Sequence, residues 1–128
     1  MAYKARILVV DDSPLYIRQI TSMLKDKYEV ESVTSGEMAL LAVETFNPDV
    51  ILLDYEMPEM DGKQVLMKLK QNMFTAAIPV IFLTAVADKR YIKEVLALRP
   101  SGYILKPVNK MELLKRIAEV RGELFDLE

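Results

Sequence analysis

Five side chains in this sequence have types and positions that could support chemistry. Each stands at or just after the end of an apolar run, and together they are Asp11, Asp12, Asp54, Thr84 and Lys106. Three carboxylates brought close together repel one another unless a positive charge is shared between them. A lysine and a hard divalent cation such as Mg²⁺ or Mn²⁺, which prefers oxygen ligands, would supply that charge. The set therefore predicts a metal-assisted site.

Asp54 is the candidate nucleophile of this site. A carboxylate can attack a phosphoryl group and form an acyl phosphate, and such a transfer depends on positioning and charge neutralisation more than on acid–base catalysis. Lys106 would place a fixed positive charge beside the phosphoryl oxygens, and Thr84 could donate a hydrogen bond to the same group. The absence of histidine from the chain is no obstacle to this chemistry.

Each of these residues alone has a simpler explanation. An acidic pair such as Asp11 and Asp12 is commonly part of a solvated loop or a helix cap, and Asp54 could cap a turn. The β-branched Thr84 suits a strand, and Lys106 suits a solvated surface. Their joint placement at the ends of apolar runs is what favours the functional interpretation.

Composition excludes several other functions. The chain has 128 residues, 52% of them apolar and 28% charged, and no apolar run approaches the roughly 18 residues that span a bilayer. The absence of cysteine and histidine excludes disulfides and the usual zinc sites. A net charge of -2 offers no electrostatic footprint for nucleic acid. The apolar run after the basic N-terminus ends in acidic residues, so we expect no signal peptide and a cytoplasmic protein.

The apolar runs predict five β-strands. They cover residues 6–10, 28–33, 49–54, 78–83 and 102–105. The first, third and fourth runs are nearly continuous, as in strands buried on both faces of a parallel sheet. The second run alternates apolar with polar residues, which suits a strand nearer the edge of the sheet.

Helical periodicity separates these runs. The apolar positions at helical spacing are Ile17, Ile20 and Leu24; Ala39, Leu40 and Val43; Val65, Leu66, Leu69 and Met73; Ile92, Val95 and Leu96; and Leu113, Ile117 and Leu124. Helix boundaries are expected at Ser13-Pro14, Thr34 with Glu37, Asn47-Pro48, and Asn109 with Glu112.

Alternation of five strands with five helices predicts an α/β fold. We expect a doubly wound, five-stranded parallel sheet in the order 2-1-3-4-5, with helices on both faces, as in flavodoxin-like proteins. The carboxyl ends of parallel strands share one rim, and ligands bind where the strand order reverses, here between the first and third strands. The five chemically suitable side chains would therefore meet at that rim.

The chain resembles the receiver domain of two-component response regulators over essentially its whole length. The motifs that carry the resemblance are Asp11-Asp12, Asp54-Tyr-Glu-Met-Pro-Glu-Met-Asp-Gly62, Leu83-Thr84-Ala85 and Tyr103-Ile-Leu-Lys106-Pro107. In this order the set is highly specific. Residues 1–128 are accordingly expected to form a single receiver domain, with no output domain visible.

The resemblance implies a role for each site residue. Asp54 would accept a phosphoryl group from a histidine kinase or a phosphotransfer protein, and Lys106 would contact that group. A Mg²⁺ or Mn²⁺ ion would be held by Asp11, Asp12, Asp54 and the backbone carbonyl of Glu56. No other cofactor is implied.

The resemblance also implies a conformational switch. Thr84 would be drawn to the phosphoryl oxygen, and the ring of Tyr103 would turn inward to fill the space left. The surface of the fourth helix, fifth strand and fifth helix would change with it, to control an output domain or protein or to pair two copies of the chain. No direct contact with nucleic acid or membrane is expected. The peptide bond between Lys106 and Pro107 resembles one that is cis in the family.

Glu56 and Val86 occupy positions that vary in the family and help to set the lifetime of the phosphoryl bond. Glu56 could repel the attacking hydroxide or pair with Lys106 before phosphorylation, whereas Val86 cannot hold a water molecule by hydrogen bonding. We therefore predict a longer-lived phosphoaspartate than asparagine at both positions would give.

Three alternatives stay open on sequence alone. A phosphatase of the haloacid dehalogenase type uses similar groups, but it places its nucleophile and acid catalyst two residues apart, and Ser13 stands two residues after Asp11. A flavin- or nucleotide-binding module would need a glycine-rich turn in place of the acidic loop. The third alternative is a receiver-like interaction module that is never phosphorylated. The sequence identifies neither the kinase nor the output, nor the oligomeric state, and does not distinguish an independent protein from part of a longer one.

Overall fold

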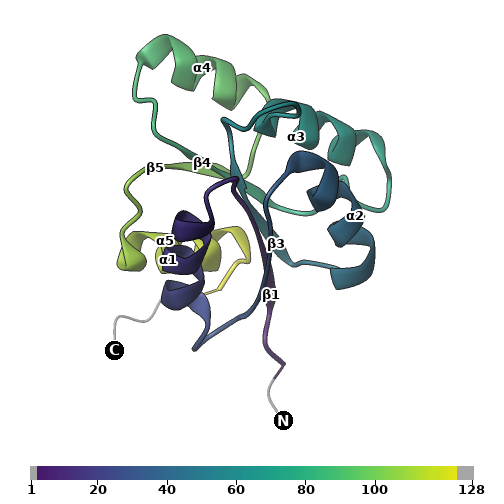
Figure 1. Cartoon of the computed structure of the whole chain (residues 1–128), viewed down its shortest axis with the longest axis vertical. Helices are drawn as coiled ribbons and strands as arrows, with labels where there is room; N and C mark the ends of the chain where they lie inside the picture. Colours follow the sequence, from purple (N-terminus) through teal and green to yellow (C-terminus); the bar gives the residue numbers. More distant parts are fainter. Residues whose placement is uncertain (1–2, 124–128) are drawn as a thin grey trace.

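The apolar runs of the sequence become the strands of one parallel sheet in the computed structural model, which describes residues 3–123 (Figure 1). The strands are β1 (Arg6–Val10), β2 (Glu29–Val33), β3 (Val50–Asp54), β4 (Val80–Thr84) and β5 (Gly102–Leu105). The helices are α1 (Pro14–Leu24), α2 (Gly36–Phe46), α3 (Gly62–Gln71), α4 (Lys89–Ala97) and α5 (Lys110–Val120). The strand order is β2-β1-β3-β4-β5, so the predicted fold class and order are confirmed.

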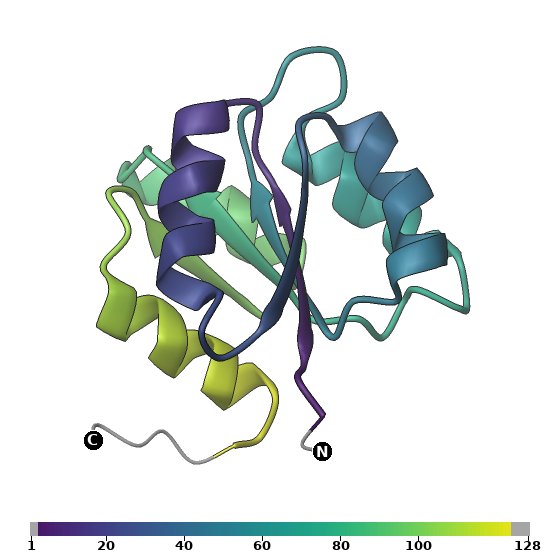
Figure 2. The same cartoon turned by 60° about the horizontal axis from the view of Figure 1, so that its bottom comes forward.

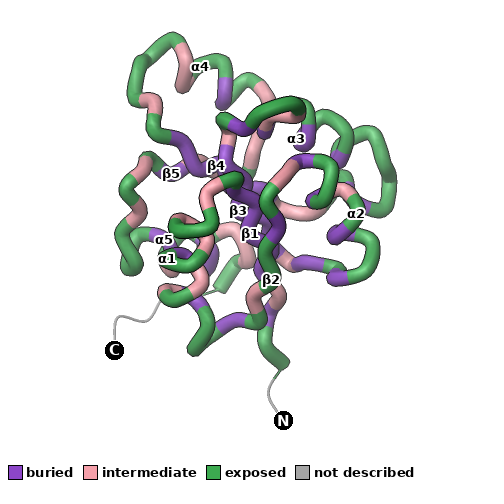
Figure 3. The backbone as a smooth tube through the Cα atoms, viewed as in Figure 1, coloured by how far each residue is buried: buried purple, intermediate pink, exposed green. Residues whose placement is uncertain are grey.

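Alternate residues of the central strands face two separate cores. Leu8 and Val10 of β1 pack with residues of α2 and α3, whereas Ile7 and Val9 pack with residues of α1 and α5. In Figure 2 the purple α1 and yellow-green α5 accordingly lie on one side of the sheet and the blue α2 on the other. Figure 3 shows the central strands buried along their length, while most of β2 is exposed or half-buried, as its alternating pattern predicts.

The start of β4 differs from the prediction. The apolar run at residue 78 predicts a strand from there, but β4 begins at Val80. The N–H of Ile78 donates to the carbonyl of Thr75 in the preceding turn, at 3.1 Å. Pro79 has no N–H to offer to a neighbouring strand, so regular pairing starts after it.

Two helices are shorter than their periodicity predicts. α3 ends at Gln71, and Met73 lies beyond it with 85% of its surface exposed. α5 ends at Val120, and Leu124, which was expected to extend it, lies outside the described residues. None of the helices within residues 3–123 is long and apolar enough to cross a bilayer.

Local capping explains where most helices begin and end. Ser13 and Asn109 cap the N-termini of α1 and α5, and Asn47, in the left-handed region with φ 52°, ends α2. These positions match the predicted boundaries. The prediction at Thr34 is wrong, because the capping side chain of α2 is that of Ser35, which directly precedes the first helical residue and accepts the N–H of Met38 at 3.2 Å.

Candidate functional site

The parallel sheet brings the three predicted aspartates together at the carboxyl ends of β1 and β3. One carboxylate oxygen from each of Asp11, Asp12 and Asp54 lies within 4.8 Å of the others. Asp11 and Asp54 are only 1% and 4% exposed, whereas Asp12 is exposed. The backbone N–H of Ser13 donates to Asp11 Oδ1 at 2.9 Å and fixes that carboxylate at the start of α1.

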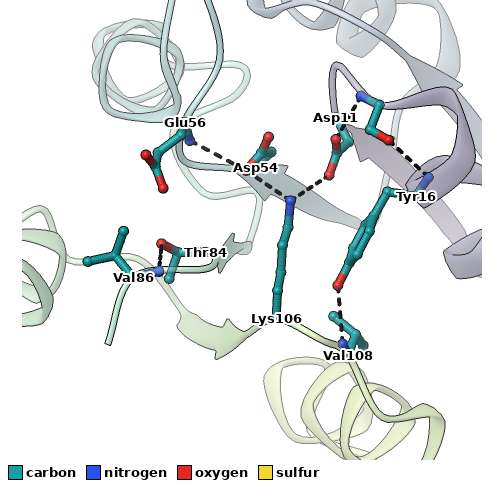
Figure 4. A network of polar contacts seen from close by, with 9 residues as sticks. Asp11, Tyr16, Asp54, Glu56, Thr84, Val86, Lys106 and Val108 are labelled. Carbon is teal, nitrogen blue, oxygen red and sulfur yellow. Dashed lines mark hydrogen bonds and ion pairs between the residues drawn. The ribbon is translucent and has the colours of Figure 1, made fainter. Parts of the chain in front are cut away.

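Lys106 reaches the same cluster from the end of β5. Its Nζ lies 3.0 Å from Asp11 Oδ2 and 3.3 Å from Asp54 Oδ1, so one ammonium group bridges the two buried carboxylates (Figure 4). The backbone N–H of Lys106 donates to the carbonyl of Thr84 at 2.8 Å, which ties β5 to β4 at the rim. The lysine is therefore held by both its side chain and its backbone.

Thr84 ends β4 and is completely buried. Its Oγ1 accepts the backbone N–H of Val86 at 3.2 Å. In the view of Figure 4, Thr84 and Asp11 lie on opposite sides of the Asp54 carboxylate. A hydroxyl in this position adds a neutral hydrogen-bonding group to a site that otherwise carries charges.

Glu56 contributes its backbone to the site. Its N–H donates to Asp54 Oδ1 at 3.4 Å, while its side chain is exposed. Among the ion pairs within residues 3–123, Lys106 pairs with Asp11 and Asp54 and not with Glu56. Of the two possibilities raised for Glu56, the structure therefore does not show the pairing with Lys106, because the exposed Glu56 side chain lies outside the pair of buried carboxylates that this lysine bridges.

Two further expectations concern β5 and the loop after it. Tyr103 is half-buried and packs against the core that contains residues of α2 and α3. The peptide bond between Lys106 and Pro107 is cis, as the resemblance implies.

The side chains of the site carry more negative than positive charge. Burial and the neighbouring charge of Asp11 raise the pKa of Asp54 to about 6, although Lys106 and the Glu56 N–H partly offset this effect. Burial alone would lower the pKa of Lys106, but its hydrogen bonds and ion pairs with Asp11 and Asp54 outweigh burial and raise it. One lysine thus faces three carboxylates, and negative charge remains in excess.

The donor set fits a hard divalent cation. All the side-chain donors are carboxylate oxygens, two of them on buried residues, and histidine and cysteine are absent from the chain. Mg²⁺ binds through one or two carboxylates plus water and phosphoryl oxygens, which matches a cluster that is buried on one side and exposed at Asp12. The residues present therefore suit Mg²⁺ or Mn²⁺.

Tyr16 is a site residue that sequence reasoning missed. The centroid of its ring lies 4.3 Å from Lys106 Nζ, and its hydroxyl accepts the N–H of Val108 at 3.1 Å. The ring therefore faces the ammonium group while the hydroxyl holds the loop that follows β5 (Figure 4). The only signal in the sequence was that residue 16 lies one helical turn before the apolar Ile20.

Gly62 allows α3 to begin directly against the end of β3. A Cβ atom at this position would lie 2.8 Å from the backbone oxygen of Asp54 and 2.8 Å from Cα of Tyr55. Neither backbone atom can move without displacing the candidate nucleophile. The motif glycine is thus explained by close backbone approach.

Comparison with known proteins gives consistent matches. The family model described as response regulator receiver domain matches residues 7–118. Protein PilH of Pseudomonas aeruginosa is 38% identical over 120 residues, which are 91% of this chain and 97% of that protein. The chemotaxis protein CheY4 of Vibrio cholerae has a structure with a TM-score of 0.86 at 30% identity, covering 92% of this chain and 99% of that one.

A longer relative shares only part of its length with this chain. The protein-glutamate methylesterase/protein-glutamine glutaminase of Trichodesmium erythraeum is 37% identical over 127 residues. Those residues are 95% of this chain and 36% of the relative. The chain therefore spans about a third of that protein's length.

Proposed function

This chain belongs to the response regulator receiver domain family, and from that premise we propose that Asp54 accepts a phosphoryl group in two-component signalling. The observation that carries the proposal is the environment of Asp54. Its carboxylate is buried, lies 3.3 Å from Lys106 Nζ, and belongs to a cluster of three carboxylates. This arrangement suits a nucleophile whose product carries more negative charge than the reactant.

The metal ligands would be Asp11, Asp12, Asp54 and the backbone carbonyl of Glu56. When bound, Mg²⁺ or Mn²⁺ supplies charge neutralisation and orientation for the phosphoryl oxygens. Its presence would also lower the pKa of Asp54 and keep the nucleophile ionised near neutral pH, because a cation beside a carboxylate favours the charged form.

The transfer itself follows from the chain's own residues. A carboxylate oxygen of Asp54 attacks the phosphorus of a phosphohistidine on a kinase or phosphotransfer protein, the P–N bond breaks, and its electron pair returns to the imidazole nitrogen. Lys106 exchanges its contact with Asp54 for one with a phosphoryl oxygen. The Thr84 hydroxyl donates a hydrogen bond to the same group, which draws the end of β4 toward Asp54.

This movement of Thr84 would change the surface formed by α4, β5 and α5. The half-buried ring of Tyr103 would turn inward as Thr84 moves away from it. The surface carries exposed apolar side chains on all three elements, at Leu96, Leu105 and Met111. These side chains suit docking to an output domain or protein, or to a second copy of the chain.

Intact mass after incubation with acetyl phosphate tests the proposal. We expect one added phosphoryl group on the wild type, dependent on Mg²⁺, and none on Asp54→Ala. Asp26→Ala, which removes an exposed carboxylate in the turn after α1, should behave as the wild type. If a folded wild-type chain gains no phosphoryl group under these conditions, an interaction module that is never phosphorylated becomes the better description.

A further inference from the structure

The hydroxyl of Tyr91, near the start of α4, is a buried polar group without a partner. Although the Tyr91 side chain is partly exposed, its Oη is shielded from solvent and forms no hydrogen bond with any residue in the range 3–123. Burial raises the pKa of Tyr91 to about 12. Buried hydroxyls are normally hydrogen-bonded. An unpaired one therefore indicates that the side chain can gain a hydrogen bond in another conformation of the protein.

Thr84 is the group that could pair with it. The Thr84 hydroxyl is close enough to lower the pKa of Tyr91, but the two hydroxyls do not meet the geometry of a hydrogen bond in this state. One lone pair of Thr84 Oγ1 is used by the N–H of Val86. A hydroxyl oxygen has two lone pairs and one proton, so Thr84 can still accept a second hydrogen bond and donate one.

The ring of Tyr91 also touches the residue next to the nucleophile. Its centroid lies 5.0 Å from that of Tyr55 in an edge-to-face arrangement, and Tyr55 packs in the same way on Phe82 of β4 at 5.2 Å. Tyr91 therefore contacts the residue beside Asp54 through its ring, and that stack continues to Phe82, two residues before Thr84 on β4.

α4 has little buried surface to hold it in place. Within its described range, Lys89–Ala97, Val95 is the only fully buried residue. Figure 1 shows α4 at the top of the molecule, beside α3. An element with so little buried surface can shift at low energetic cost, so a single hydrogen bond can bias its position.

We propose that Tyr91 is a positioning residue that couples Thr84 to α4, with its hydroxyl donating to Thr84 Oγ1 once the Thr84 hydroxyl donates its own hydrogen bond to the phosphoryl group on Asp54. This inference rests on the proposed phosphorylation of Asp54. The phosphorylated state then contains a continuous chain of hydrogen bonds from α4 through Thr84 to the phosphoryl oxygen. In the proposed phosphorylated state the Tyr91 hydroxyl gains the partner that it lacks in the resting state, which gives the two states different stabilities at α4.

The resting and phosphorylated states should therefore respond differently to Tyr91→Phe. Removing an unpaired buried hydroxyl leaves the resting state unchanged or more stable, whereas it removes a hydrogen bond from the phosphorylated state. A matched control exists in Tyr28, whose hydroxyl is likewise buried and unpaired among the described residues but packs in the opposite core.

Amide hydrogen exchange of the α4 peptide, measured with Mg²⁺ in the absence and presence of acetyl phosphate, tests the inference. In the wild type, phosphorylation should slow exchange in residues 89–97. In Tyr91→Phe this gain in protection should fall by about fivefold, the effect of losing one hydrogen bond. In Tyr28→Phe the gain should equal that of the wild type. Thr84→Ser should retain the gain. In the Thr84→Val variant, adding Tyr91→Phe should cause no further change in exchange.

Intact mass of the same samples separates this inference from the proposed function. An unchanged gain in Tyr91→Phe at equal phosphoryl occupancy would overturn the role of Tyr91 and leave the phosphorylation of Asp54 intact. Equal losses in Tyr91→Phe and Tyr28→Phe would also overturn it, because a packing effect would then explain both. No phosphoryl adduct on the wild type would overturn the proposed function and this inference with it.

Discussion

At the residue scale, burial controls the protonation of Asp54. Its pKa is raised from 3.8 to about 6, so the folded protein binds this proton more tightly than the unfolded chain does. The corresponding contribution to stability is fully present below about pH 4 and is lost as the pH rises through about 6. Without a metal ion, the ionised carboxylate then destabilises the fold by about 2–3 kcal/mol at neutral pH.

Asp54→Asn should therefore stabilise the metal-free protein at neutral pH. In EDTA at pH 8 we expect its free energy of unfolding to exceed that of the wild type by about 1–3 kcal/mol. The difference should narrow as the pH falls from 6 toward 4, where the wild-type carboxyl becomes neutral. Denaturant titrations across this range measure it. A difference that does not change with pH would contradict the electrostatic explanation.

Tyr16 should influence the rate of phosphorylation through its contact with Lys106. Tyr16→Leu removes the ring that lies 4.3 Å from Lys106 Nζ, and we expect phosphorylation by acetyl phosphate to slow by about three- to tenfold. Tyr16→Phe keeps the ring but loses the hydrogen bond to Val108, so it should be affected less. The rate of phosphoryl incorporation, followed by intact mass, checks this order. A leucine variant as fast as the wild type would show that the ring has no such role.

Glu56 and Val86 should set the lifetime of the product. The exposed Glu56 carboxylate stands two residues beyond Asp54, and the half-buried Val86 side chain offers no hydrogen bond to a hydrolytic water. We expect Glu56→Asn combined with Val86→Asn to shorten the phosphoaspartate half-life by several-fold. The decay of the intact-mass adduct after removal of acetyl phosphate measures it, and an unchanged decay rate would refute the prediction.

Sequence reasoning could find the residues whose type and strand-end position carry the chemistry, but not their supporting tyrosines. Asp54 and Lys106 follow directly from the ends of apolar runs, because parallel strands share one rim. Tyr16 and Tyr91 reach the site from α1 and α4. Their distance along the sequence from the strand ends is not fixed by the sheet, so no spacing rule points to them. Tyrosine on a helix is also common for ordinary packing, so its residue type gave no further signal.

At the scale of elements, strands could be predicted better than the points where they begin. Ile78 is apolar and looks like part of β4, but its N–H is used in a turn, and Pro79 cannot pair through nitrogen. Thr34 and Ser35 are both good capping residues, and only the position of the first helical residue decides between them. Such boundaries depend on which backbone N–H and C=O groups form hydrogen bonds, and the spacing of apolar residues carries no information about those bonds.

The junction between β3 and α3 should tolerate no side chain at residue 62. Gly62→Ala would place Cβ against backbone atoms of Asp54 and Tyr55, and we expect it to reduce the free energy of unfolding by about 1–3 kcal/mol. Gly102→Ala is the matched control, because its Cβ would meet only Ile81 at 4.0 Å, an ordinary contact. Urea unfolding of both variants measures the effect. Equal stabilities would contradict the close-approach explanation.

At the scale of the whole molecule, the site stands where the two cores meet the rim of the sheet. Tyr55, Tyr91 and Tyr103 pack against the core that contains residues of α2 and α3, whereas Tyr16 and Val108 pack against the core that contains residues of α1 and α5. A phosphoryl group on Asp54 would therefore act on both cores through contacts already present. That residues 1–128 form a single receiver domain stays a prediction, as does the use of the α4, β5 and α5 surface for docking.

The most direct test of the central claim is to locate the phosphoryl group by chemical trapping. Borohydride reduces an acyl phosphate to the alcohol, which converts a phosphoaspartate to homoserine, and peptide mass spectrometry then identifies the altered residue. After incubation with Mg²⁺ and acetyl phosphate, we predict homoserine at position 54 and unmodified aspartate at positions 11 and 12. Homoserine at position 11 or 12, or its absence from position 54 in a chain that carries the phosphoryl group, would contradict the assignment of Asp54 as the acceptor.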